Sequence, residues 1–232
     1  MTITTKLTYK DLPTTGLTGI GGEGGGSSWS SDNDIDLLIE ATGTSDTHEA
    51  FNLGSKLADL NIVKGRYDTY VVTHKDTDDT IVTLKNIERL VCTDKALALD
   101  VNGEAGEVYA LLAAGLGVSD ISPSLFGVGL YLKDLGKTDV ELAQMLLDSP
   151  VYKQDALGSS NETFVKHVYK NVTGNTISLE DLALFTGWLD NKLMTQAQLL
   201  ESASNLEFFR DADHINLVGV ADTGIEYTTF TV

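Results

Sequence analysis

The sequence predicts an α+β protein with a β-rich N-terminal part, a duplicated helical domain and short C-terminal strands. In residues 1–101, short apolar and β-branched runs alternate with polar turns, which is typical of strands. In residues 102–213, apolar residues recur with the period of a helix, and residues 105–152 align without a gap with residues 162–209 at a spacing of 57. Residues 214–232 return to a strand-like pattern.

The N-terminal part contains several runs whose composition predicts a strand. These are Thr2–Tyr9, Ile35–Ile39, Tyr67–Val72, Thr80–Leu84, Ile87–Cys92 and Ala96–Val101. Thr47–Leu60 is predicted to form a short helix, and the glycine- and serine-rich run 21–28 a flexible loop. Cys92 is the single cysteine and lies in an apolar run, so we expect a buried thiol and no intramolecular disulfide.

Capping residues and an internal repeat organise the second half. Three pairs have the spacing of a capping box: Thr138 with Glu141, Ser178 with Asp181, and Thr195 with Gln198. The ungapped alignment pairs Val108 with Val165, Gly117 with Gly174, Tyr131 with Trp188 and Leu132 with Leu189. We therefore expect two copies of a three-helix unit that pack on each other around a common core. The C-terminal strands are expected to pair with the N-terminal sheet.

The charge of the chain excludes some classes of partner. The 34 acidic and 16 basic residues give a formal net charge of −18. This charge repels nucleic acid and anionic membrane surfaces, and it makes divalent cations natural counter-ions. The alternative is that the charge only aids solubility. No apolar run is long enough to span a membrane, and no cleavable signal peptide is apparent at the N-terminus, so composition alone also allows a cytoplasmic location.

Catalytic motifs are incomplete, and we expect no enzyme activity. The run from Gly19 to Gly24 has GxGxxG spacing, but neither a strand before it nor a helix after it is predicted, so a plain loop is favoured. His48-Glu49 resembles the start of a zinc-protease helix, but Asn52 occupies the position of the second histidine.

Two clusters of aspartates are the candidate metal sites. Asp32, Asp34 and Asp36 stand at alternate positions, and Asp76, Asp78 and Asp79 form a second cluster. Calcium binds several carboxylate oxygens presented by one loop, so calcium is the expected cofactor. The alternative is a solvated turn, because aspartate also suits turns.

The run from Asn86 to Gly106 resembles a segment of bacterial RTX-type adhesins and surface proteins, with the pattern VERL-x-F-T-D … A-L-D-x-x-G-x-A-G. In these proteins the segment leads into a helical domain distantly similar to phycobilisome linker modules. Phe164–Val172 and Trp188–Asp190 are similar to further signatures of that domain, and Leu217–Tyr227 to the ending of such proteins. The likeness covers about residues 80–232.

The resemblance implies export by a type I system with an uncleaved C-terminal secretion signal, within residues 214–232, and an extracellular milieu that contains calcium. Some features depart from the family. The run Tyr109–Gly115 lacks the usual arginine and phenylalanine, Tyr131 stands for a tryptophan, and no aspartate-bearing RTX nonapeptide is present. Calcium-roll binding therefore does not carry over, and the resemblance supplies no catalytic residues to transfer.

The expected function is that of a secreted structural protein that self-assembles at the cell surface or in the matrix, as a surface-layer, filament or matrix subunit. Edge strands near both termini would allow polymerisation by strand addition. The alternative is an extracellular binding or adhesion module for a cell-surface glycan, a small ligand or a surface protein. A single pocket lined by Trp29, Tyr67, Tyr70 and Trp188 would favour this alternative.

Overall fold

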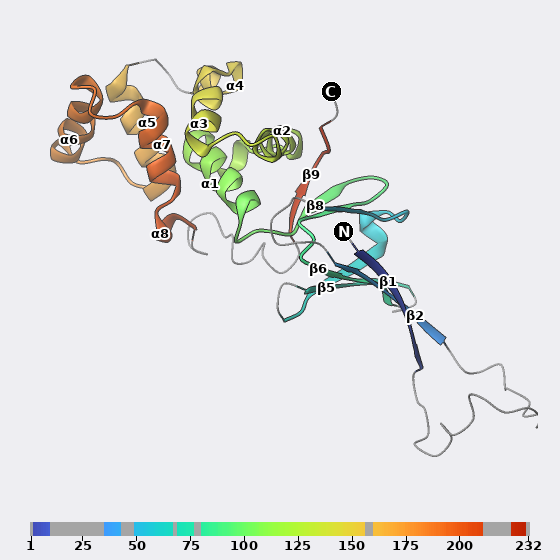
Figure 1. The fold of residues 1–232 in the computed structure, drawn as a ribbon. Coiled ribbons are helices and arrows are strands. Elements are labelled where there is room, and N and C mark those ends of the chain that lie inside the picture. Colours follow the sequence, from blue (N-terminus) through green and yellow to red (C-terminus); the bar gives the residue numbers. More distant parts are fainter. Residues whose placement is uncertain are drawn as a thin grey trace, which may run out of the picture.

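The computed structural model describes residues 2–9, 35–42, 49–66, 69–76, 80–155, 160–210 and 224–230. Within these residues the strands precede the helices along the chain, apart from one strand near the C-terminus, and the predicted α+β class is confirmed. Figure 1 shows the strands gathered at one end of the molecule and the helices of residues 161–210 farthest from them.

The described strands form two sheets. They are β1 (Thr2–Tyr9), β2 (Ile35–Thr42), β3 (Ala50–Asn52), β4 (Leu60–Lys64), β5 (Thr69–His74), β6 (Thr80–Lys85), β7 (Arg89–Val91), β8 (Ala96–Ala98) and β9 (Ile225–Tyr227). The order is β1-β2-β6-β5-β4 in the larger sheet and β3-β7-β8-β9 in the smaller one. Because β9 pairs with β8, the expected pairing of the C-terminal strand with the N-terminal part is confirmed.

The short helix predicted over Thr47–Leu60 is wrong. Of its described residues, Ala50–Asn52 form β3 and Leu57–Asp59 form a 3-10 helix, η1. β3 pairs with β7 in parallel, and the Leu53 amide donates to the Val91 carbonyl over 2.8 Å. Pairing with a strand that is distant in sequence overrides a weak local preference for helix.

The described helices are α1 (Glu104–Leu116), α2 (Pro123–Asp134), α3 (Asp139–Asp148), α4 (Pro150–Asp155), α5 (Asn161–Thr173), α6 (Leu179–Asp190), α7 (Gln196–Ser204) and α8 (Glu207–Arg210), with a 3-10 turn η2 (Val118–Asp120) after α1. Five of them, α2, α3, α5, α6 and α7, begin after a serine or threonine whose side chain caps the first turn. The capping boxes predicted at Thr138 and Thr195 are confirmed. At Ser178 the hydroxyl caps α6 as predicted, but the Asp181 carboxylate accepts from that hydroxyl itself.

The helices α1–α4 and α5–α8 are two copies of one unit. α1 and α5 begin 57 residues apart, as do α3 and α7. Gly117 and Gly174, which the alignment pairs, end α1 and α5 with φ of 94° and 70°. The Asn171 side chain donates to the carbonyl of Ala114, its own counterpart, over 3.1 Å. Residues that meet their own counterparts lie near a two-fold axis, so the copies pack with approximate two-fold symmetry.

The alignment of α2 with α6 is shifted by one residue from the prediction. The residues that cap these helices, Ser122 and Ser178, are 56 residues apart. Leu132 therefore corresponds to Trp188, and the predicted pairs Tyr131–Trp188 and Leu132–Leu189 are wrong. The connection before α6 is one residue shorter than the one before α2, and the connection after α6 is one residue longer. The two changes in length cancel, so α3 and α7 are again 57 residues apart and an ungapped alignment does not reveal the shift between α2 and α6.

Arg89 joins the smaller sheet to the helices. Its side chain is buried and forms ion pairs with Asp100 and with Asp134 at the end of α2. The other carboxylate oxygen of Asp100 accepts from the backbone of Ala105 in the first turn of α1, over 3.1 Å. Arg89, Asp100 and Ala105 belong to the run that resembles RTX-type proteins, and in this chain they fix the first helix against β7.

Candidate functional site

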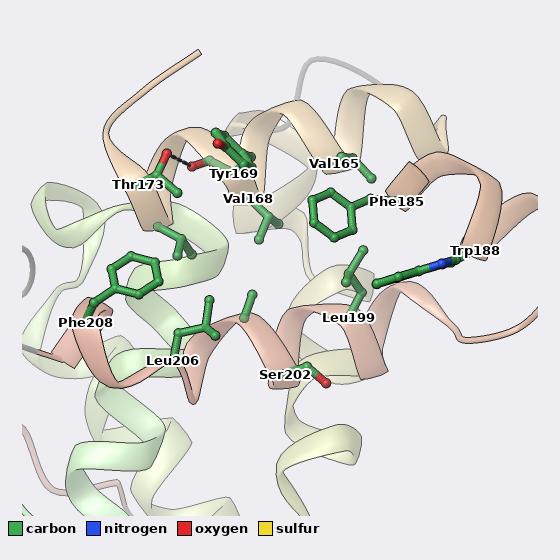
Figure 2. Close-up of a pocket in the computed structure, with 12 residues that line it drawn as sticks. Val165, Val168, Tyr169, Thr173, Phe185, Trp188, Leu199, Ser202, Leu206 and Phe208 are labelled. Carbon is green, nitrogen blue, oxygen red and sulfur yellow. Dashed lines mark hydrogen bonds between the residues drawn. The ribbon is translucent and has the colours of Figure 1, made fainter. Parts of the chain in front are cut away.

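An apolar groove lies at the surface of the second repeat. Its volume is about 380 Å³, and α5 and α7 form its two sides (Figure 2). The lining residues are Val165, Val168, Tyr169, Val172 and Thr173 from α5, Phe185 and Trp188 from α6, Leu199, Ser202 and Ala203 from α7, and Leu206 and Phe208. Figure 2 shows Phe185 and Trp188 closing one end and Phe208 the other. The sequence placed only Trp188 among candidate binding residues.

The first repeat has the same groove in a narrower form. A cavity of about 160 Å³ is lined by Val108, Leu111, Leu112, Leu125, Val128, Gly129, Leu132, Leu142, Met145, Leu146 and Ser149. Most of these positions correspond to lining positions of the larger groove. Gly129 corresponds to Phe185 once the one-residue shift is applied. A Cβ on Gly129 would lie 2.7 Å from Val108 Cγ1, so any larger residue would require Val108 or the helix to shift. Phe185 lines the second groove at this corresponding position, and its ring meets that of Trp188 edge to face at 5.1 Å.

Apolar residues extend beyond the open groove. Leu179 is 87% and Leu193 73% exposed, and Leu184 is also exposed, as are Leu206 and Phe208 in the groove itself. The surrounding residues 160–210 contain six acidic and four basic residues, far closer to neutral than the whole chain. Exposed apolar patches with polar rims mark interaction surfaces in soluble proteins.

The C-terminal segment covers the outer face of α2. Thr228 donates its backbone N–H to the carbonyl of Pro123 over 3.1 Å, and the rings of Tyr227 and Phe126 meet edge to face at 6.3 Å. A Cβ on Gly127 would lie 2.0 Å from the Thr228 carbonyl oxygen, so glycine is required at this contact. Among the described residues, no comparable segment covers α6.

β1 and β4 are the two outermost of the described strands in the larger sheet. Gly65 donates to the Thr69 carbonyl over 2.8 Å, and Lys75 to the Asp59 carbonyl over 2.9 Å, so the odd-numbered residues of this stretch bond to β5. Because the direction of backbone groups alternates along a strand, the N–H and C=O groups of Ile62 and Lys64 point away from β5. No described strand lies on that side.

A second cavity, of about 320 Å³, lies between the larger sheet and the start of α1. Its lining is polar in part: Lys64, Tyr70, Asn86, Ile87, Glu88, Leu99, Asp100, Val101, Asn102 and Gly103. Burial is the main cause that raises the pKa of the Glu88 carboxyl, although that carboxylate accepts from the Glu49 amide over 2.9 Å. Tyr70 contributes to this cavity and Trp188 to the groove, so the structure does not bring these two aromatics together. Trp29 and Tyr67 lie outside the described residues.

The predicted calcium ligands fall mostly where the structure gives no description. Asp32, Asp34, Asp78 and Asp79 lie outside the described residues, and Asp36 belongs to β2. Asp76 follows β5 and is exposed. Within the described ranges, no three His, Cys, Asp or Glu residues are grouped so that they could hold a metal ion. Cys92 is buried, as predicted, and burial raises the pKa of its thiol.

No family model, curated protein or solved structure matches this chain. The resemblance to RTX-type surface proteins therefore stays a prediction from sequence motifs. In the part of the chain that the structure describes, no helix has both the length and the apolar character that crossing a bilayer demands.

Proposed function

We propose that this chain is a secreted structural protein of the cell surface or extracellular matrix, whose copies assemble by strand addition. The observation that carries the proposal is that the first and last described strands are the outermost strands of their sheets: β1 in the larger sheet and β9 in the smaller. An unpaired edge offers a row of backbone donors and acceptors to a strand of another molecule.

β1 lacks most of the devices that protect an edge from pairing. Proteins shorten edge strands, interrupt them with proline or a bulge, or place charges on them. β1 has eight residues in unbroken register with β2 and contains no proline. Lys6 is its only charged residue, in a chain with 34 acidic residues. A second strand could therefore add along its whole length without bringing carboxylates together.

The expected extracellular location fits this mode of assembly. A formal charge of −18 opposes association of identical chains. Calcium at the cell surface would neutralise part of this charge, so assembly should depend on calcium. Light scattering and electron microscopy of the purified full-length chain, with and without millimolar calcium, test the proposal. We expect polymers with calcium, and a chain that stays monomeric under all conditions would contradict it.

The location needs its own measurement. In a bacterium that carries a type I secretion system, the chain is expected in the medium or on the cell surface. Its retention in the cytosol, in the presence of a working system, would remove the extracellular part of the proposal.

The second candidate is an extracellular binding module, and the open groove favours it. An amphipathic helix of a surface protein can place its apolar face in such a groove, whereas the nearly pure apolar lining suits a glycan poorly. Replacing Trp29 by phenylalanine leaves Trp188 as the only tryptophan. Titration of that variant with a neutral apolar dye should change the fluorescence of Trp188, and an unchanged signal would contradict binding in the groove.

A further inference from the structure

The two outermost described strands of the larger sheet, β1 and β4, run in opposite directions. β1 is antiparallel to β2, β2 is parallel to β6, β6 is antiparallel to β5, and β5 is antiparallel to β4. β4 therefore runs parallel to β2 and opposite to β1. A second copy placed beside the sheet in the same orientation presents its β4 antiparallel to β1 of the first copy.

The faces of the two edges match in this arrangement. The register aligns Val63, Val71, Thr83, Glu40 and Thr4 in one row across the five strands, because each is the pairing partner of the next. Val63 is 61% exposed, so this row lies on the outer face of the sheet. The neighbouring rows contain buried residues such as Val72, Val82 and Leu84.

Among the described strands, neither edge strand has a partner on its outer side, and neither contains a negatively charged residue. The backbone groups of Ile62 and Lys64 point away from β5, towards the position that a strand of the next copy would take. β4 (Leu60–Lys64) and β1 contain no carboxylate. Since the chain as a whole is strongly acidic, these edges are places where two copies can meet without opposed negative charges.

The part of the hairpin farthest from the sheet gains most from such pairing. β2 pairs with β6 only over Glu40–Thr42, so the remaining residues of β2 have β1 as their only described partner strand. A two-stranded ribbon is marginally stable in water, and a third strand stabilises it.

We propose that β1 of one copy pairs antiparallel with β4 of the next, so that the larger sheets of successive copies form one continuous sheet. The contact joins two different surfaces, and each added copy leaves one β1 and one β4 open. Repeated without closure, it produces a polar, helical filament and not a closed dimer. This inference rests on the proposed assembly function and specifies its contact.

Engineered cysteines test the contact in the full-length chain. The first variant combines Val63→Cys with Thr4→Cys in one chain. Two further variants combine Val63→Cys with Thr2→Cys or with Thr8→Cys. Positions 2 and 8 share the face of position 4 on β1, so these variants allow for a different register between the two strands. Val63→Cys with Thr5→Cys is the matched control, since adjacent residues of a strand lie on opposite faces. Native Cys92 stays in place, and the native chain receives the same mild oxidation in calcium.

The expected result is a ladder of covalent dimers, trimers and larger species from at least one outer-face variant, and none from the Thr5→Cys control or the native chain. Covalent dimers from Thr4→Cys alone, without a ladder from any double variant, would assign β1 to a closed dimer and overturn the inference. Filaments seen by microscopy without a ladder from any variant would also overturn it, while the assembly function stands. Absence of any assembly would overturn both.

Discussion

Gly127→Ala is predicted to detach the C-terminal segment from α2. The added Cβ would lie 2.0 Å from the Thr228 carbonyl oxygen and 3.1 Å from its carbonyl carbon. The obstructing atoms belong to the backbone, so no side-chain rotation can relieve the clash. The segment has to move away from the helix, and the hydrogen bond from Thr228 to Pro123 is lost with it.

The size of the effect follows from three contributions. Overpacking of this kind costs about 1–3 kcal/mol, and the lost hydrogen bond costs about 1 kcal/mol. The higher helix propensity of alanine returns about 1 kcal/mol. We therefore expect a net loss of roughly 1–3 kcal/mol in the free energy of unfolding, with about 2–4 °C in Tm for each kcal/mol in a chain of this size.

Gly187→Ala provides the matched control. Gly187 lies in α6 of the second repeat, where a Cβ would meet nothing within 4 Å. The same substitution should therefore stabilise the protein by up to about 1 kcal/mol. Urea unfolding of both variants measures the two free energies. If Gly127→Ala proved as stable as the native chain while Gly187→Ala gained stability, the contact between the C-terminal segment and α2 would be refuted.

Three further predictions concern a buried hydroxyl, a helix cap and the groove. Burial raises the pKa of Tyr152 to about 12, so the folded state holds this proton more tightly than the unfolded state and stability falls as pH rises from about 10 to 12. The Tyr152 hydroxyl has no described hydrogen-bond partner, so the Tyr152→Phe variant should melt at the same temperature as the native chain, or higher, at neutral pH. Between pH 10 and 12 the variant should lose less stability than the native chain. An equal loss in both proteins would contradict the assignment of this pH dependence to Tyr152. Hydrogen bonds lower the pKa of Glu141 to about 2: the largest effect comes from the backbone N–H of Thr138 and the next from the Lys137 side chain. The stability that the ionised Glu141 carboxylate contributes is present above pH 4.5 and is lost as the pH falls towards 2. Glu141→Gln should therefore reduce the loss of unfolding free energy between pH 4.5 and 2. Substitution of Gln198, the uncharged capping-box residue of α7, should leave this pH dependence unchanged. Trp188→Ala should weaken binding of a neutral apolar dye at least about fivefold, equivalent to about 1 kcal/mol, and undiminished affinity would place the dye elsewhere.

Local patterns predicted the helical half well because the interactions that start its helices are local. The hydroxyl of a capping residue meets a backbone N–H three residues away, so the sequence alone contains both partners. This explains why Thr138 and Thr195 were identified correctly. β3 depends instead on pairing with β7, about forty residues along the chain, and no short-range pattern near Ala50–Asn52 indicates that partner.

The groove could not be derived from the sequence because it depends on the one-residue shift between α2 and α6. In the ungapped alignment Phe185 corresponds to Val128, and replacement of one apolar residue by another suggests no opening. With the caps Ser122 and Ser178 aligned, Phe185 corresponds to Gly129, and a large ring replaces a glycine at a helix contact. Comparison of the two capping serines was the signal that could have corrected the alignment.

The two corresponding helical surfaces have different surroundings. In the first copy, Gly129 lets α2 close on α1, and Gly127 admits the C-terminal segment that ties α2 to the sheets. In the second copy these positions hold Phe185 and Ala183, and each is incompatible with the close approach seen in the first. The first copy therefore connects the smaller sheet to the helices. The second can present an open apolar surface without weakening that junction, so a change in the groove is expected to alter binding and leave strand-mediated assembly intact.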